Sequence, residues 1–323
     1  MIPPAAMIGM RPAMFFSSLM AVLARLLTTG YSGPPLHALQ ILFARQSITS
    51  LACLIYLHMH SIPHAPFGDP AVRLLLLARG TGGFIGVFGI YYSLTYLDLS
   101  EATVITFLSP VVATYACSVI PSLREPFTHV EVIAGGVSLL GVTLIARPAV
   151  IFGAPEGEGG GVEGVTPEQR VVAVSVALVG VFGAAAAYTC IRWIGKRAHP
   201  LISVFYFSAI CCVISGVGLG VLPGVGGVVW PSGAVQWGLL GGIGVTGFVM
   251  QFLLTSGLQR EKAGRGTSVL YTQMVFALVW ERVVWGTSPG GWSCVGSGLV
   301  FGSAVWVGTR KKSVEKVLIG VMG

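Results

Sequence analysis

Charge is scarce in this sequence. Only 10% of its 323 residues are Asp, Glu, Lys or Arg, whereas 54% are hydrophobic, and the mean hydropathy is +0.82. An ordinary soluble domain carries charge on about 25% of its residues. So low a charge content excludes most soluble enzymes and indicates a chain that is surrounded largely by lipid.

Several site patterns are also missing. The six Cys all lie inside apolar segments and form no C-x-x-C pair, which argues against a disulfide framework and a zinc site. No Gly-Lys-Ser/Thr sequence is present, so a Walker-type nucleotide loop is excluded. His58, His60 and His64 are expected to be solvated loop residues, because a zinc site needs further ligands in fixed geometry. We therefore expect no catalytic residue, no cofactor and no bound metal.

What the sequence does contain is a series of ten apolar stretches of about 20 residues, the length that a helix needs to cross a hydrocarbon core ~30 Å thick. Backbone groups in lipid must be satisfied within the segment, so each stretch is predicted to be an α-helix. The first could be a signal peptide, but no small-residue cleavage site follows it, and we expect a retained helix. The predicted spans are 6–29, 37–59, 72–96, 100–121, 128–147, 170–194, 199–222, 234–258, 264–285 and 290–309.

The net charge of +7 is spread over short loops rather than along one stripe, which disfavours nucleic acid as a partner. If the chain starts in the cytoplasm, thirteen of the 19 basic residues are cytoplasmic and two, Arg147 and Arg170, lie on the opposite side. This bias follows the positive-inside rule. It predicts a multi-pass protein with both termini cytoplasmic, in either the plasma membrane or a secretory-pathway organelle. The cytoplasmic set is Arg11, Arg73, Arg124, Arg192, Lys196, Arg197, Arg260, Lys262, Arg265, Arg310, Lys311, Lys312 and Lys316.

The chain contains an internal repeat. A shift of 163 residues brings two halves of five spans each into register, and an odd number of spans inverts the second copy in the membrane. Inverted repeats with a site at their interface are a frequent transporter plan. The predicted organisation is a first repeat (1–148), a Gly/Glu-rich connector (149–169), a second repeat (170–310) and a short basic tail (311–323). The register pairs Ser93 with Ser256, Asp98 with Glu261, Pro126 with Pro289 and Gly135 with Gly298.

The segment YYSLTYLDLSEATVITFLSPVVATYACSVIPSLREPFTHVEVIAGGVSLLGVTLIARP (91–148) resembles the repeat of the drug/metabolite transporter superfamily, EamA type. The segment TSVLYTQMVFALVWERVVWG (267–286) is similar to the branch that contains the solute carrier family 35 member G proteins. The resemblance covers 14–310 and implies an all-α membrane protein of ten helices. These would form two inverted five-helix repeats around a cavity made mainly by helices 1–4 and 6–9. The solute stays undetermined, because the superfamily carries nucleotide sugars, amino acids, purines and organic anions.

Charged residues inside the spans are candidate cavity groups, because charge is costly in lipid. Arg45 lies about nine residues into its span, or ~13 Å of helix rise, and could meet an anionic solute or form a structural pair. Arg79 lies closer to an end, where it could face the cavity or reach the headgroups. Glu281 and Arg282 lie deep in the ninth span and point ~100° apart, so they do not pair with each other. The structural alternative is a fixed pair of Glu281 with Arg45 or Arg79.

A second set of candidate substrate-binding residues is uncharged. Hydroxyl and amide groups can bond a polar solute, but they also bridge helices. Three members follow an i, i+3, i+6 spacing along one side of the fourth span, and others occupy the corresponding part of the ninth span and the eighth. The set is Thr103, Thr106, Ser109, Gln251, Thr267, Tyr271 and Gln273.

Together these patterns favour a secondary transporter that moves a small polar, anionic metabolite by alternating access. A membrane-embedded adaptor or regulator of another protein, without transport activity, is the alternative. A membrane enzyme is disfavoured, because the sequence shows no reactive pair with useful spacing. The expected partners are a small-molecule solute and the lipid bilayer, and a homodimer stays open.

Overall fold

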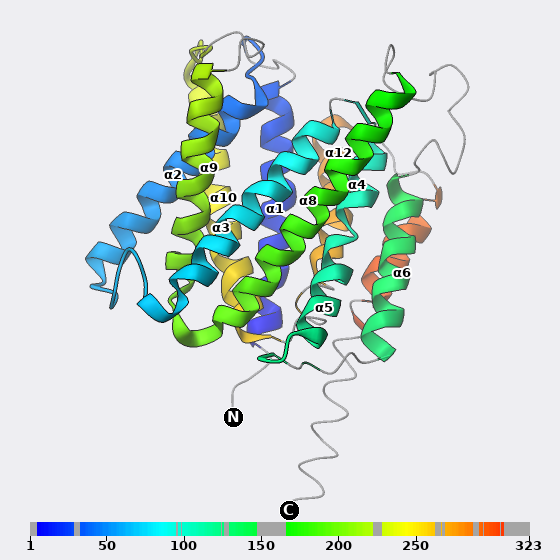
Figure 1. Cartoon of the computed structure of the whole chain (residues 1–323). Helices are drawn as coiled ribbons and strands as arrows, with labels where there is room; N and C mark the ends of the chain where they lie inside the picture. Colours follow the sequence, from blue (N-terminus) through cyan, green and yellow to red (C-terminus); the bar gives the residue numbers. More distant parts are fainter. Residues whose placement is uncertain are drawn as a thin grey trace, which may run out of the picture.

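The computed structural model describes residues 5–28, 33–94, 96–97, 99–123, 125, 129–146, 166–221, 228–261, 266, 269–286, 291–292, 294–303 and 305–306. Within these ranges the regular structure is helical and contains no strand. The helices form an elongated bundle with long, roughly parallel and antiparallel members (Figure 1). The all-helical fold class is therefore confirmed for the described part of the chain.

Six helical segments are long and apolar enough to cross a membrane, and the others that coincide with predicted spans are shorter. The expectation of a multi-pass membrane protein is thereby confirmed. The six are α2 (Ala38–Met59), η1 with α3 (Pro70–Val72, Arg73–Ser93), α4 with α5 (Leu99–Thr106, Ser109–Val119), α8 with η2 (Pro167–Ile194, Gly195–Arg197), α9 (Pro200–Val221) and α10 (Ala234–Arg260). The shorter ones are Pro12–Thr28 within α1 (Ala5–Thr28), Val132–Ile145 within α6 (His129–Ala146), Cys294–Ser303, and α12 (Thr272–Trp285) after η4 (Val269–Tyr271).

The fourth predicted span is interrupted rather than continuous. α4 ends at Thr106, and α5 begins three residues later with Pro110 in its first turn. Proline has no N–H, so it cannot donate to the carbonyl one turn earlier, that of Thr106. The N–H groups of Val111 and Val112 both donate to the Leu108 carbonyl instead. The tightened turn separates two shorter helices within one span.

At the corresponding place in the ninth predicted span, the 3₁₀ turn η4 precedes α12. No proline lies there, but the Thr272 hydroxyl donates to the Val269 carbonyl at 2.6 Å. This turn contacts the interruption between α4 and α5: the Tyr271 hydroxyl donates to the Phe107 carbonyl at 3.1 Å, and the two rings stack with centroids 5.5 Å apart. Side chains thus bond backbone carbonyls at both places.

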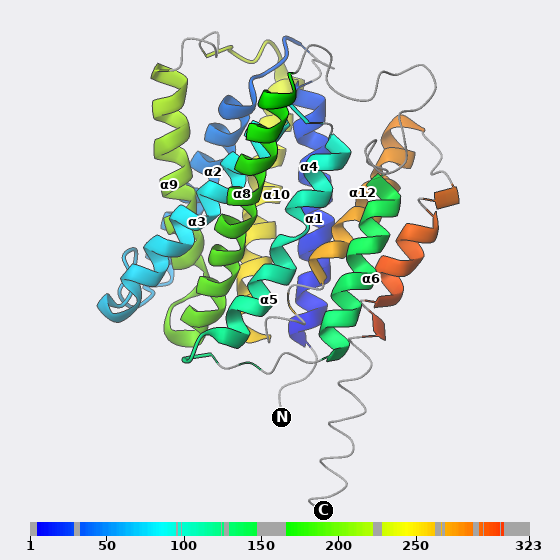
Figure 2. The same ribbon diagram turned by 45° about the vertical axis from the view of Figure 1, so that its right-hand side comes forward.

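The two halves of the chain interlock along their helices. α3 lies along α8, α1 along α10 and α2 along α9, and these are the most extensive pairs. α3 also contacts α9 and α10 contacts α2, while α5 contacts α8 and α12 contacts α1. α6 lies at the edge of the bundle beside the helix that contains Ser303 (Figure 2), and the hydroxyls of Ser138 and Ser303 are 2.6 Å apart.

The seam between α3 and α8 depends on glycine. A Cβ atom on Gly89 would lie 2.6 Å from the Cα atom of Gly180 and 3.1 Å from the Val176 carbonyl oxygen. Both neighbours are backbone atoms, which cannot rotate away. Membrane helices commonly use small residues in this way to bring their backbones together, since lipid gives them no hydrophobic reason to associate.

The bundle has two ends, which we call lower and upper after their place in Figure 1. At the lower end, Met10 near the start of α1 packs with Leu258 near the end of α10. At the upper end, Gln40 of α2 joins the segment before α10: its Nε2 donates to the Val229 carbonyl at 2.5 Å, and its Oε1 accepts from the Val229 N–H at 3.1 Å. Contacts between the two halves therefore exist at both ends.

His199 lies outside the spans, between η2 and α9, and caps α9. Its Nδ1 accepts a hydrogen bond from the Leu201 N–H at 3.3 Å. Burial, together with the charges of Arg260 and His60, lowers the pKa of His199 below its ordinary value of 6.5. A protonated imidazole could not accept this bond, because both of its nitrogens then donate.

We expect acid to destabilise the protein partly through His199. Because its pKa is lower in the folded state, the unfolded state binds more protons as the pH falls through about 6.5, and stability decreases there. The variant His199→Asn keeps a capping acceptor but does not titrate. Melting temperatures in detergent at pH 7.5, 6.5 and 5.5 should fall less for the variant than for the wild type. Equal acid sensitivity would contradict a role for His199.

Candidate functional site

Arg79 is the most deeply buried of the described Lys and Arg side chains, with 3% of it exposed. It projects from α3 toward two other helices. Its Nη2 donates to Oε1 of Gln251 on α10 at 3.1 Å, and its guanidinium carbon lies 4.3 Å from the ring centroid of Phe207 on α9. A neutral amide and an aromatic face orient the charge without neutralising it.

Two hydrogen-bond donors at this place have no partner. Nε of Arg79 and Nε2 of Gln46 are buried and unbonded, and Gln46 is 1% exposed. Cys211 of α9 lies beside both residues. We call Gln46, Arg79, Phe207, Cys211 and Gln251 the Arg79 cluster. Burying an unbonded donor costs about 1–3 kcal/mol, and an acceptor oxygen placed at the Arg79 cluster could bond these donors.

Arg45 of α2 contacts α10 one helical turn away from Gln251, a member of the Arg79 cluster. Its side-chain carbons face Gly247, which precedes Gln251 by four residues and so lies on the same face of α10. Its Nη1 donates to the Met20 sulfur at 2.9 Å, and a thioether is only a weak acceptor. Within the described part of the chain, neither Arg45 nor Arg79 has a carboxylate ion-pair partner.

Gly83 leaves room for the Arg79 side chain. A Cβ atom at this position would lie 2.7 Å from the Phe207 ring and 3.1 Å from Nη1 of Arg79. Gly83 is one turn beyond Arg79 on the same helix, so it shares its face. The absence of a side chain there leaves space for the guanidinium over the ring.

The uncharged candidates separate into two places. Gln251 belongs to the Arg79 cluster, whereas Tyr271 contacts the interruption between α4 and α5 and is 1% exposed. Ser109 is buried at the start of α5, and the Thr106 hydroxyl donates within its own helix to the Ala102 carbonyl at 2.8 Å. The remaining described members, Thr103 and Gln273, are partly buried in α4 and α12.

The remaining charged candidates either lie away from the Arg79 cluster or fall outside the described residues. Arg282 is exposed in the last turn of α12, where its Nη1 donates to the Gly286 carbonyl at 2.9 Å. Arg282 therefore lies at a helix end and is not a member of the Arg79 cluster. Thr267 and the side chain of Glu281 lie outside the described residues, so the pairing of Glu281 with either arginine stays a prediction.

Sequence reasoning missed Gln46 and Phe207. Gln46 is part of the polar run QSITS (46–50) inside an otherwise apolar span, and that run is a usable signal. Phe207 lies among apolar residues with nothing in the sequence to mark it. In the described residues, no group of three or more His, Cys, Asp or Glu could hold a metal ion.

Comparison with known proteins places this helical bundle in a family. The EamA-like transporter family matches residues 5–147 and again residues 171–309. This chain belongs to the EamA-like transporter family. The EamA match appears once before and once after the connector, and it covers the described helices except the first four residues of α8. The resemblance inferred from the sequence is thereby confirmed, and the chain is a membrane protein of a transporter family rather than of an enzyme family.

Relatives of this EamA-family chain are named as a membrane protein, a probable transport protein and a solute carrier. It is 42% identical over 302 residues to the uncharacterized membrane protein YMR253C of Saccharomyces cerevisiae, covering 91% of this chain and 72% of that protein. It is 37% identical over 316 residues to the probable transport protein YPL264C of the same yeast, covering 94% and 88%. Human solute carrier family 35 member G1 is 28% identical over 278 residues, covering 85% and 72%.

A solved structure shares the EamA-family fold. The match, to a protein described only as "Crystal structure of protein", has a TM-score of 0.75 and covers 97% of this chain and 100% of the other. The two sequences are 16% identical. At that identity the likeness concerns the fold alone.

Proposed function

We propose that this EamA-family chain is a secondary transporter that binds a small anionic metabolite at the Arg79 cluster. The observation that carries the proposal is the buried Arg79 guanidinium, which has no described carboxylate partner and an unbonded Nε, next to the unbonded Nε2 of Gln46. An ionised acceptor would bond such donors more strongly than a neutral one, by roughly a factor of two. Two relatives are named as a probable transport protein and a probable transporter, and these names agree with the general role.

Arg45 supports the anionic character of the solute. It lies one turn of α10 away from Gln251, about 6 Å of helix rise. Two guanidinium groups on the same side of one helix raise the local positive potential, and a low-dielectric surrounding screens that potential little. A cationic solute would be repelled from this place.

The packing supports a pair of inverted repeats. Adding 163 to the residue numbers converts α1 to α8, α2 to α9, α3 to α10 and α5 to α12, with starts that agree within two residues and ends that agree within four. Under that exchange, the contact of α3 with α8 becomes that of α10 with α1. In the same way α3–α9 becomes α10–α2, and α5–α8 becomes α12–α1. A two-fold axis in the membrane plane would produce such exchange pairs.

Contacts between equivalent residues agree with such an axis. Residues near a two-fold axis meet their own counterparts in the other copy. Ser47 lies 3.2 Å from Cys212, and Tyr271 bonds Phe107 at 3.1 Å, with sequence separations of 165 and 164. Helices interrupted at matching places are typical of transporters whose halves rock about a central site. These features support alternating access between the two halves.

We further propose that the lower end faces the cytoplasm, so that both termini are cytoplasmic. The basic residues at the ends of α8 and α10 and in η2 lie at this end, whereas Arg170 lies at the start of α8, at the upper end (Figure 1). The positive-inside rule places the more basic end in the cytoplasm.

The proposal is tested by counterflow in proteoliposomes that contain the purified protein. Four panels of solutes are compared: carboxylates, phosphate-bearing metabolites, neutral polar solutes and organic cations. Protein-dependent exchange of an anionic solute is the expected result. Exchange confined to cations or neutral solutes would contradict the anionic site. Absence of exchange in all four panels, with a protein partner that co-purifies reproducibly, would favour the adaptor alternative.

Replacing Arg45 by Ala is expected to reduce uptake of the anionic solute about 10-fold, because one of two nearby cations is lost and each tenfold corresponds to about 1.4 kcal/mol. The measurement is the initial rate of uptake into proteoliposomes at sub-saturating solute. Arg73→Ala is the matched control, since Arg73 begins α3 and bonds only the Gly68 carbonyl among its described contacts. Unchanged uptake in Arg45→Ala would remove Arg45 from the site.

A further inference from the structure

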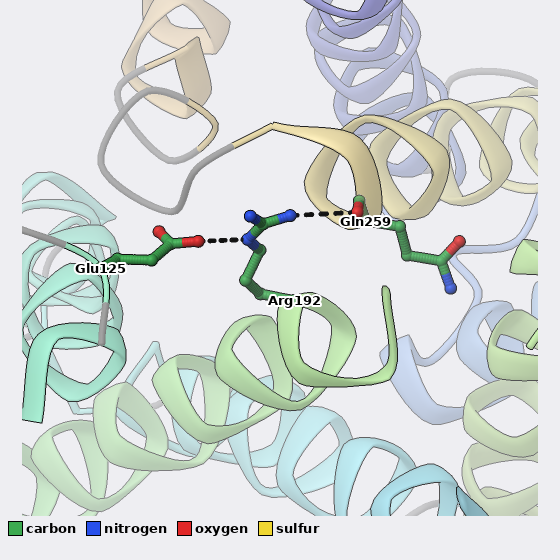
Figure 3. Close-up of polar contacts among 3 residues, drawn as sticks. All are labelled: Glu125, Arg192 and Gln259. Atoms are coloured by element: carbon green, nitrogen blue, oxygen red, sulfur yellow. Dashed lines mark hydrogen bonds and ion pairs between the residues drawn. The ribbon is translucent and has the colours of Figure 1, made fainter. Parts of the chain in front are cut away.

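At the lower end, an ion pair and a hydrogen bond converge on Arg192 (Figure 3). Arg192 lies in the last turns of α8. Its Nε is 2.5 Å from Oε1 of Glu125, which follows α5, and its Nη1 donates to the Gln259 carbonyl at the end of α10 at 3.1 Å. We call Glu125, Arg192 and Gln259 the lower latch.

The lower latch is partly shielded from solvent. The Arg192 and Glu125 side chains are only 22% and 11% exposed, so their attraction is screened less than that of a surface pair. The Gln259 carbonyl lies at the C-terminal end of α10, where the helix dipole favours a cation. A further hydrogen bond fixes Gln259, because its side chain donates to the Ala198 carbonyl at 3.4 Å.

The lower latch joins the two halves of the chain. Glu125 belongs to the first half, and Arg192 and Gln259 belong to the second. The 163-residue register aligns Glu125 with Ser288 and Arg192 with Thr29, so the repeat supplies no second charged pair of this kind. The described bridges at the upper end instead use the neutral amides of Gln40 and Gln236.

A line of buried polar groups leads from the Arg79 cluster to the lower latch. On α10, Gln251, Thr255 and Gln259 are four residues apart and so lie on one face, over about 12 Å of helix rise. Thr255 is fully buried and its hydroxyl has no partner. On α8, Tyr188, which lies beside Arg79, precedes Arg192 by one turn. The lower latch therefore lies at the end of a row of buried polar side chains that starts at the Arg79 cluster.

We propose that the lower latch is a gate. It holds the two halves together at the lower end, and it must separate before a solute can pass between the Arg79 cluster and that side of the membrane. The inference rests on the proposed transport function. Weakening the latch shifts the population toward conformations that are open at the lower end, in proportion to the free energy that it contributes.

Cys117 of α5 supplies a native reporter for this opening. It is fully buried, its carbonyl accepts from the Glu125 N–H at 3.3 Å, and its thiol faces Thr189 of α8. Separation of α5 from α8 at the lower end would expose this thiol. A background variant keeps Cys117 and carries Ala at Cys53, Cys190, Cys211, Cys212 and Cys294.

The experiment measures the rate at which a hydrophilic maleimide labels Cys117 in the purified full-length chain. Glu125→Gln and Arg192→Gln are expected to label about 5- to 30-fold faster than the background, the effect of shifting a two-state equilibrium by one ion pair. The conservative variant Arg192→Lys, which keeps a cationic donor beside Glu125 and the Gln259 carbonyl, is expected to label at a rate closer to the background than Arg192→Gln does. Arg197→Gln is the matched control, since Arg197 lies at the same end and its described bonds go to its own segment, at Trp193 and Ile194.

Equal labelling rates in the background, Glu125→Gln and Arg192→Gln would overturn the gate. So would an Arg192→Lys variant that labels as fast as Arg192→Gln, because faster labelling would then not depend on the charge of the latch. Labelling needs no solute, so failure of every solute panel would count against the proposed function and not against the gate. Unchanged labelling in a chain that transports would overturn the gate alone.

Discussion

Arg79→Met is expected to reduce uptake of the anionic solute about 30-fold or more, because losing one partner of a desolvated charged contact costs about 2–5 kcal/mol. The melting temperature should not fall with it. Arg79 is a buried charge without a described carboxylate partner, and replacing such a charge by an apolar side chain removes its desolvation cost. The paired measurements are initial uptake rates in proteoliposomes and melting temperatures in detergent.

The opposite directions of the two readouts distinguish a binding residue from a structural one. A structural Arg79 would lower both uptake and melting temperature when replaced. Arg73→Met, on the same helix but outside the Arg79 cluster, is the control and should leave both readouts near wild type. A variant Arg79→Met that transports normally would remove the Arg79 cluster from the account.

Gly89→Ala is expected to lower the free energy of unfolding by about 1–3 kcal/mol, the usual cost of forcing extra atoms into a packed seam. The added methyl would meet the backbone of α8 at Gly180, 2.6 Å away. Because Arg79 belongs to α3, the seam also fixes the position of Arg79 along α8. Thermal unfolding in detergent and the yield of monodisperse protein are the measurements.

The control for this prediction is another helical glycine. A Cβ atom on Gly238 of α10 would meet nothing within 4 Å. Gly238→Ala should therefore be neutral or stabilising by up to about 1 kcal/mol, the helix-propensity difference between the two residues. If both variants lowered stability equally, the close approach of α3 and α8 would not be the cause.

The membrane helices could be predicted because the hydropathy of the sequence alone indicates them. A run of about 20 apolar residues has few alternatives to a spanning helix, and the six long apolar segments agree with this expectation. The interruption at Pro110 also has a cause in the sequence, since proline removes a backbone donor. The 3₁₀ turn before Thr272 has no such residue. Its contact with Phe107, which lies 164 residues from Tyr271, cannot be inferred from local sequence.

The charged candidates illustrate a second limit. Arg79 and Arg282 both lie in apolar runs, yet one is 3% exposed and the other is exposed at a helix end. A sequence gives the depth of a residue along a span but not the direction in which its helix face points. That direction depends on which neighbour packs there, here α9 and α10 around Arg79.

The missed members of the Arg79 cluster have the same explanation. Phe207 is unremarkable in an apolar span, and only the arrival of Arg79 from α3 makes its ring a cation-binding face. Gln46 could have been selected from its polar neighbours. Its significance, however, lies in a donor that remains unbonded after folding, which is a property of the packed structure.

The central claim is that a buried cationic cluster binds an anionic solute, and ligand-induced thermal stabilisation tests it most directly. Purified protein is melted in the presence of matched anionic, neutral and cationic solutes. A ligand at 100 times its Kd stabilises the folded state by about 2.7 kcal/mol. An anionic solute should raise the melting temperature of the wild type and of Arg73→Met, and it should not raise that of Arg79→Met. Stabilisation by cationic solutes, or an anion effect that Arg79→Met retains, would contradict it.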